Sequence, residues 1–138
     1  MEQGKMGAYI LFVEDDAISR RLIEKIFRRT PHLQVDLAKN GKEALEMVKQ
    51  NRYDLIFMDI QMPHLDGLQA TREIRRREAA GTGIHTPVVA VSAYVAQEDR
   101  QRCQEAGMDD FLPKPIDVKG LMEAISHYSQ QTNGSPGD

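Results

Sequence analysis

The chain has 138 residues, 41% of them hydrophobic and 28% charged, with a formal net charge of -3. This length and composition are typical of one globular domain, and the small negative charge argues against nucleic-acid binding by the whole chain. The single cysteine, Cys103, excludes an internal disulfide, and no apolar run approaches the roughly 20 residues that span a bilayer. The N-terminus lacks the apolar segment of a signal peptide, so we expect a cytoplasmic protein.

The chain is expected to divide into three segments. Residues 1–7 form an N-terminal extension, and residues 8–128 form one folded domain. Residues 129–138 are polar, with two glycines and a proline, and are interpreted as a flexible tail or the start of a linker. The sequence leaves open whether the chain is a stand-alone protein or part of a longer one.

Short apolar runs alternate with longer helical patterns along the chain. The runs predict five strands, over residues 8–13, 33–38, 54–59, 87–93 and 110–113. Apolar residues at helical spacing predict five helices that include residues 18–27, 41–50, 68–74, 97–106 and 118–125. Asp66 and Asp117 are expected to cap the third and fifth helices, and Gly107 is expected to end the fourth.

Two helices carry patterns whose burial can be predicted. In the first helix, one apolar stripe is formed by Ile18, Leu22 and Ile26 with the adjacent Ile23 and Phe27. In the third helix, a basic run is interpreted as a solvated face; it consists of Arg72, Arg75, Arg76 and Arg77. Cys103 in the fourth helix is expected to be a small packing residue.

The alternation of strands and helices predicts the fold. It indicates an α/β domain with a doubly wound, five-stranded parallel sheet and helices on both faces. The order 2-1-3-4-5, which is flavodoxin-like, places the polar second strand at an edge and the first and third strands side by side. Ligand sites in such sheets lie at the carboxyl ends of the strands, near the point where the strand order reverses.

Charged and hydroxyl side chains follow the predicted strands at that edge. They are Glu14, Asp15 and Asp16 after the first strand, Asp59 at the end of the third, Ser92 at the end of the fourth, and Lys114 after the fifth. Asp16 fits a helix N-terminus, where the helix dipole favours acidic residues. The other carboxylates would repel one another unless Lys114 or a divalent cation, most plausibly Mg²⁺, compensates their charge.

This set of groups is suited to phosphoryl transfer. A carboxylate beside Mg²⁺ and a lysine is a competent nucleophile toward phosphorus, because the cations neutralise charge on the phosphoryl oxygens. The hydroxyl of Ser92 can donate to one of those oxygens. We therefore expect Asp59 to form an aspartyl phosphate.

Four motifs resemble those of the receiver domains of two-component response regulators. They are "VEDD" at 13–16, "DLIFMDIQMPHLDG" at 54–67, "VVAVSA" at 88–93 and "GMDDFLPKP" at 107–115. The resemblance covers residues 9–128 and is most like the receivers of hybrid sensor histidine kinases. It implies that Mg²⁺ is held by Glu14, Asp15, Asp59 and the backbone carbonyl of Gln61.

The resemblance also implies roles for residues of the last two motifs. Lys114 contacts the phosphoryl group, with a cis bond to Pro115 that aims it inward, and Ser92 is the switch hydroxyl. Phe111 is the switch aromatic, although it is as readily explained as simple half-buried packing. Where many members have Tyr, Phe111 has no hydroxyl, so any switch through it must act by packing.

These roles imply a signalling module rather than a conventional turnover enzyme. The module takes a phosphoryl group from a histidine kinase or a histidine phosphotransfer protein and assists its own phosphorylation and dephosphorylation. Phosphorylation then changes the face made by the fourth helix, fifth strand and fifth helix. Other domains of a longer chain are possible partners, whereas direct binding to nucleic acid or membrane is not expected.

The sequence disfavours three other functions. A phosphatase with an aspartyl-phosphate intermediate often needs a second Asp two residues after the nucleophile, where this chain has Gln61. A flavodoxin-like cofactor site needs a phosphate loop after the first strand, and the acidic residues 14–16 would repel a phosphate. A receiver that signals without phosphorylation ranks low, because every acceptor-site residue is present.

Overall fold

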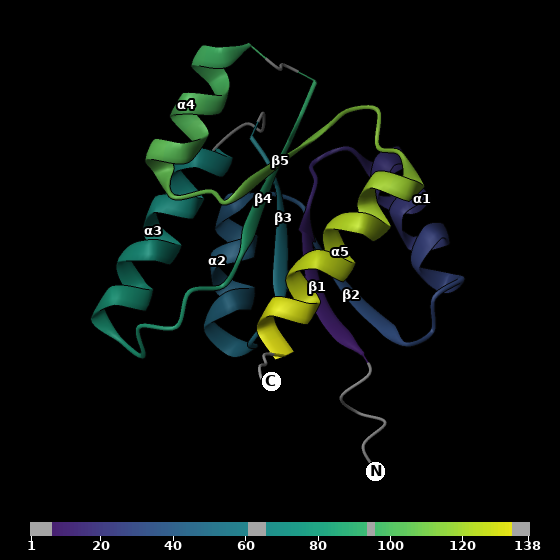
Figure 1. The fold of residues 1–138 in the computed structure, drawn as a ribbon, viewed down its shortest axis with the longest axis horizontal. Helices are drawn as coiled ribbons and strands as arrows, with labels where there is room; N and C mark the ends of the chain where they lie inside the picture. Colours follow the sequence, from purple (N-terminus) through teal and green to yellow (C-terminus); the bar gives the residue numbers. More distant parts are fainter. Residues whose placement is uncertain (1–6, 61–65, 94–95, 134–138) are drawn as a thin grey trace.

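A computed structural model describes residues 7–60, 66–93 and 96–133 of the chain (Figure 1). The strands are β1 (Ala8–Val13), β2 (Leu33–Ala38), β3 (Leu55–Asp59), β4 (Val88–Ser92) and β5 (Asp110–Pro113). The helices are α1 (Ala17–Arg28), α2 (Gly41–Gln50), α3 (Gly67–Ala80), α4 (Gln97–Ala106) and α5 (Val118–Asn133). No helix among these residues is long and apolar enough to cross a membrane.

The five strands form one parallel sheet in the order β2-β1-β3-β4-β5, which confirms the predicted topology. Helices α1 and α5 cover one face, and α2, α3 and α4 cover the other (Figure 1). Every residue of β3 and β4 is buried, because these strands lie inside the sheet and are covered on both faces. Strand β2 is half-buried along most of its length, as expected of an edge.

Alternate strand residues serve two separate cores. Leu11, Ile56 and Met58 pack with α2, α3 and α4 on one face. Phe12 and Phe57 stack on the other face, with ring centroids 5.0 Å apart, among residues of α1 and α5. Burying both faces fixes the register, since a slip by one residue would exchange the two sets of side chains. The carboxyl ends of the strands are therefore held in fixed relative positions.

The predicted helix ends at Asp66, Asp117 and Gly107 are confirmed, and Asp16, which was predicted only to lie at a helix N-terminus, also caps α1. The carboxylate of Asp16 accepts from the backbone N–H of Ser19 at 2.8 Å, and Asp66 caps α3 in the same way. Asp117 accepts a longer bond of 3.4 Å at the start of α5. Gly107 ends α4 in the left-handed conformation, with φ of 104°.

The predicted apolar stripe of α1 is wrong at two positions. Ile23 and Phe27 are buried, whereas Ile18 is 79% exposed and Leu22 is 54% exposed. The two sets differ because a helix turns by about 100° per residue, so Leu22 points well to the side of Ile23. Only the stripe through Ile23 and Phe27 faces the sheet, which leaves two large apolar side chains at the start of α1 in solvent.

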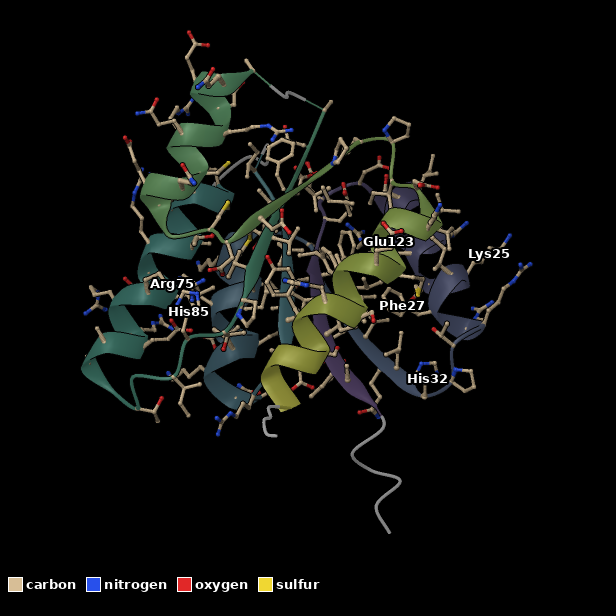
Figure 2. The ribbon with its side chains drawn as sticks, in the orientation of Figure 1. Lys25, Phe27, His32, Arg75, His85 and Glu123 are labelled. Atoms are coloured by element: carbon tan, nitrogen blue, oxygen red, sulfur yellow. The ribbon has the colours of Figure 1, made fainter. Side chains whose placement is uncertain are left out.

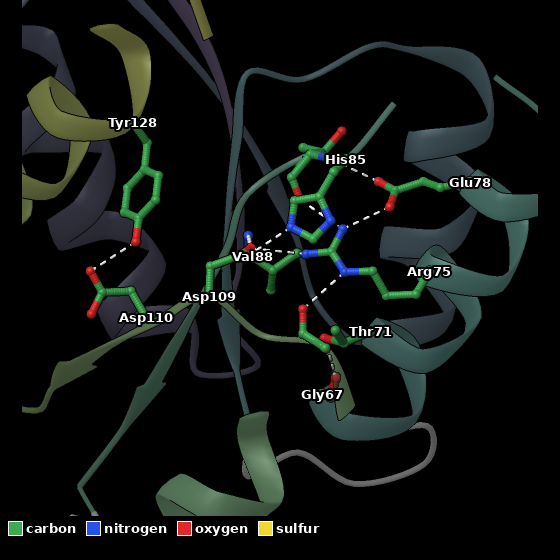
Figure 3. Close-up of polar contacts among 11 residues, drawn as sticks. Gly67, Thr71, Arg75, Glu78, His85, Val88, Asp109, Asp110 and Tyr128 are labelled. Atoms are coloured by element: carbon green, nitrogen blue, oxygen red, sulfur yellow. Dashed lines mark hydrogen bonds and ion pairs between the residues drawn. The ribbon is translucent and has the colours of Figure 1, made fainter. Parts of the chain in front are cut away.

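The basic run of α3 is solvated at Arg72, Arg76 and Arg77, as predicted, but not at Arg75. Arg75 is 16% exposed, and Nε donates to the carbonyl of Gly107 at 2.9 Å (Figure 3). Its Nη1 donates to the carbonyl of Thr86 at 2.8 Å. The prediction failed here because these acceptors come from segments distant in the sequence.

The same guanidinium forms two ion pairs, with Glu78 at 2.8 Å and with Asp109 at 2.9 Å. Asp109 also accepts from the backbone N–H of Val88 and contacts His85, which lies next to Arg75 (Figures 2 and 3). This network joins α3 to the segments that enter β4 and β5. It fastens the end of the sheet opposite the carboxyl ends of the strands.

Replacing Arg75 by Met should lower the free energy of unfolding by about 2–3 kcal/mol, because two carbonyls and two carboxylates lose a charged donor. Urea denaturation monitored by circular dichroism measures the change. The matched control is Arg72→Met, an exposed arginine one turn earlier, which should change stability by less than about 0.5 kcal/mol. Equal losses in the two variants would contradict the role assigned to Arg75.

Candidate functional site

The carboxyl ends of four strands bring the predicted site residues together. Asp59 is the last residue of β3, Ser92 is the last of β4, and both are buried. Glu14 and Asp15 directly follow β1. One carboxylate oxygen from each of Glu14, Asp15 and Asp59 lies within 4.8 Å of the others. The predicted acidic cluster is thus present in the structure.

Lys114 follows β5 and supplies the positive charge of the cluster. Its Nζ lies 3.1 Å from Asp59 Oδ2 and 3.4 Å from Glu14 Oε1. Burial acts to lower the pKa of Lys114, but the two carboxylates outweigh it and raise the pKa above its usual value. The backbone N–H of Lys114 donates to the carbonyl of Ser92 at 2.9 Å, and the bond to Pro115 is cis, as the resemblance implied.

Glu14 is a nearly fully buried carboxylate. Its Oε2 accepts from the backbone N–H of Asp16 at 3.1 Å, whereas Oε1 has no hydrogen-bond partner among the residues that the structure describes. Burial raises the pKa of Glu14, and the nearby charge of Asp59 raises it further, against the opposing effect of Lys114. Lys114 therefore contacts two acidic side chains, Glu14 and Asp59, and opposes the effect of burial on Glu14.

The donor set suits a hard divalent cation. Mg²⁺ prefers carboxylate and carbonyl oxygens and keeps several waters, so it needs only one or two carboxylates and access to solvent. Asp15 is exposed, and Glu14, whose Oε1 contacts Lys114 Nζ at 3.4 Å, belongs to the same cluster. Glu14, Asp15 and Asp59 could hold the ion together. Gln61, whose carbonyl was expected as a further ligand, lies outside the described residues.

The structure shows two residues that support the site and that the sequence analysis did not predict. Arg20 Nη1 donates to the carbonyls of Glu14 and Asp15, at 3.0 and 2.9 Å, and so fixes the backbone that carries them. Gly67 packs against β3, where an added Cβ would lie 2.3 Å from the carbonyl oxygen of Asp59. Arg20 lies one turn into α1, and this spacing after an acidic pair is the signal that could have indicated it.

Phe111 lies outside the acidic cluster. It is half-buried on β5, opposite Ala90 in the register, and the guanidinium of Arg100 lies over its ring at 4.9 Å from the centroid. Phe111 is half-buried, as the packing interpretation expects, and its role as the switch aromatic stays a prediction. Nothing in the amino-acid sequence indicated that Arg100 contacts the ring of Phe111.

The profile of the response regulator receiver domain family matches residues 10–126, so the chain belongs to that family. The domain is a signalling module of two-component phosphorelays. Its relatives include "hybrid signal transduction histidine kinase L" of Dictyostelium discoideum, at 36% identity over 99% of this chain. Another is the autoinducer 2 sensor kinase/phosphatase LuxQ of Vibrio parahaemolyticus, at 42% identity over 88% of this chain. The chain spans only 8% and 14% of these two kinases.

Solved receiver domains match most of this chain in structure. One, from a sensor histidine kinase of Pseudomonas aeruginosa, has a magnesium ion coordinated in its active-site cleft. It is 37% identical, with a TM-score of 0.78, and the match covers 89% of this chain and 98% of that one. The receiver domain of Ssk1 from Saccharomyces cerevisiae was solved with the phosphotransfer protein Ypd1. That match has 31% identity, a TM-score of 0.81 and 89% coverage of each chain.

Changing Glu14 to Gln should stabilise the metal-free protein at pH 7. Because burial raises the pKa of Glu14 in the folded state, the folded state binds the proton more tightly than the unfolded chain does. The contribution of Glu14 to the stability of the wild type should therefore fall as the pH rises from about 4.5 through the raised pKa.

Thermal unfolding in the presence of a chelator, at pH 7 and at pH 4, measures this effect. The variant should have the higher melting temperature at pH 7, and its advantage should shrink at pH 4. The control is Glu46→Gln on α2, where the carboxylate is exposed. A lower melting temperature for Glu14→Gln at pH 7 would show that pairing with Lys114 outweighs burial.

Proposed function

We propose that Asp59 of this receiver domain accepts a phosphoryl group from a phosphohistidine. The observation that carries the proposal is the position of Asp59, buried at the end of β3 with Lys114 Nζ at 3.1 Å and two acidic residues beside it. A buried carboxylate with one cation in contact is fixed in place, and the strand on either side holds it rigid. The membership of the receiver family supports the same role.

The chemistry follows from these contacts. A carboxylate oxygen of Asp59 attacks phosphorus, the P–N bond of the phosphohistidine breaks, and the imidazole leaves with its electron pair and takes up a proton. Lys114 neutralises charge on a phosphoryl oxygen, and the hydroxyl of Ser92 donates to another. Mg²⁺, when bound by Glu14, Asp15, Asp59 and the carbonyl of Gln61, supplies further positive charge at the same oxygens.

The domain is proposed to act as a switch rather than as a turnover enzyme. Ser92 and Phe111 are proposed to respond to phosphorylation and to change the face made by α4, β5 and α5. The domain is also proposed to assist the transfer of the phosphoryl group to Asp59 and its later hydrolysis. We place this unit at residues 8–128, which the match to the family over residues 10–126 supports.

A histidine kinase or a histidine phosphotransfer protein is the proposed donor, as the pairing of Ssk1 with Ypd1 suggests. Ile18 and Leu22 are exposed at the start of α1, directly after the acidic residues. Apolar side chains beside a reactive group suit the centre of an interface, where they lose contact with water on binding. The long kinases among the relatives support a place within a longer chain.

Incubation with acetyl phosphate and Mg²⁺ should place one phosphate on the wild-type chain, detected by mass spectrometry of the intact protein. Asp59→Asn should remove the adduct, because the amide is not a nucleophile. Lys114→Met should slow its formation by about 10²-fold, and a chelator should abolish it. An adduct that persists in Asp59→Asn would contradict the assignment, and multiple turnover of a phosphomonoester would favour a phosphatase.

The docking role of α1 is tested with phosphorylated Ypd1 as the donor. Ile18→Ser and Leu22→Ser should each slow transfer from Ypd1 by about tenfold, because each removes an apolar contact at the interface. Transfer from acetyl phosphate should be unchanged. The matched control is Ile84→Ser, since Ile84 is 42% exposed but lies at the other end of the sheet. Equal slowing with both donors would contradict the docking role.

A further inference from the structure

The two halves of helix α4 are attached to the protein in different ways. The C-terminal half buries Cys103 and Ala106, and it ends at Gly107, whose carbonyl accepts from Arg75. In the N-terminal half, over residues 97–102, Asp99 is half-buried and the other five side chains are exposed. The N-cap residue, Ala96, provides no side-chain hydrogen bond. The helix is therefore anchored at its C-terminal end and weakly held at the other.

One contact joins the weakly held half to the sheet. The guanidinium of Arg100 lies over the ring of Phe111 on β5, 4.9 Å from its centroid. Within the described part of the chain, no hydrogen bond or ion pair is recorded between residues 97–102 and β5, and Arg102 pairs with Asp99 inside the helix. An open groove of about 810 Å³, lined by Arg100 and Phe111 among others, runs between helix and strand. Because this groove separates helix and strand, close packing does not hold the N-terminal half of α4 against β5.

The strand that carries Phe111 leads directly to the acidic site. Lys114 is three residues further along, its Nζ lies 3.1 Å from Asp59, and its backbone N–H donates to the carbonyl of Ser92. A phosphoryl group on Asp59 would offer Lys114 new oxygen atoms, further out from the end of β3. If Lys114 moves toward these oxygen atoms, it pulls on the end of β5. The ring of Phe111, which lies on β5 beneath Arg100, then moves as well.

We propose that Arg100 is a positioning residue that latches the N-terminal half of α4 to β5 through the ring of Phe111. In the unphosphorylated protein the latch holds α4 in place, and a shift of β5 on phosphorylation of Asp59 releases it. Its role in the response to phosphate rests on the proposed function. An exposed cation–π contact changes an equilibrium by only about two- to fivefold, which suits a contact that must open and close.

Hydrogen exchange of the α4 amides tests the latch without any phosphate donor. Arg100→Met keeps the aliphatic stem and removes the charge, so exchange in α4 should become about two- to fivefold faster. Arg100→Lys keeps a cation and should exchange close to the wild-type rate. The control Arg102→Met removes another exposed arginine of the same helix and should have no such effect.

A double-mutant cycle assigns the effect to the ring. Phe111→Leu keeps an apolar side chain but removes the π face, and it should speed exchange in α4 as Arg100→Met does. Combining the two changes should add little to either one. Wild-type exchange in Arg100→Met, or fully additive effects in the double variant, would overturn the proposal.

Phosphorylation by acetyl phosphate tests the coupling to Asp59. Release of the latch should make Arg100→Met accept phosphate about two- to fivefold faster than the wild type, with Arg102→Met unchanged. Equal rates in all three proteins would contradict the coupling alone. Failure of every protein to take up phosphate would contradict the proposed function instead, and the exchange results would still decide whether Arg100 holds α4.

Discussion

The buried carboxylates at the ends of β1 and β3 are the constraint on which the rest of the site depends. Glu14 and Asp59 are both removed from water, and Lys114 contacts both of them. Buried charges of one sign persist only when the structure around them is rigid and supplies compensation. The sheet provides the rigidity through its doubly covered strands. Arg20 holds the acidic segment from outside, and Gly67 lets α3 begin directly against the backbone of Asp59.

The two ends of the sheet serve different purposes. At the entry to β4 and β5, Arg75 and Asp109 satisfy backbone groups and tie α3 to both segments. These contacts hold the entry ends of the two strands together. At the carboxyl ends, Glu14, Asp15 and Asp59 gather beside Lys114. Helix α4 connects the two regions, because its C-terminal end is fastened near Arg75 and its other half rests on Phe111.

The residues of the acidic cluster and the exposed side chains around it lie on different elements. The acidic cluster, Ser92 and Lys114 stand in the motifs on which the resemblance was based. Ile18 and Leu22 are exposed at the start of α1, and Arg100 of α4 lies over the ring of Phe111 on β5. These side chains surround the site without belonging to the acidic cluster.

Sequence alone determined the strand order, the cap at Asp66, the place of Asp16 at a helix N-terminus, and the convergence of the acidic residues on one edge. These features follow from local patterns and from the geometry that all parallel sheets share. Tertiary structure alone decided which stripe of α1 is buried, why Arg75 is enclosed, and what Arg100 contacts. Each depends on partners in other elements of the fold, such as the carbonyl of Gly107, 32 residues from Arg75. Periodicity indicates that a side chain lies on a helix face, but only packing decides which neighbour meets it.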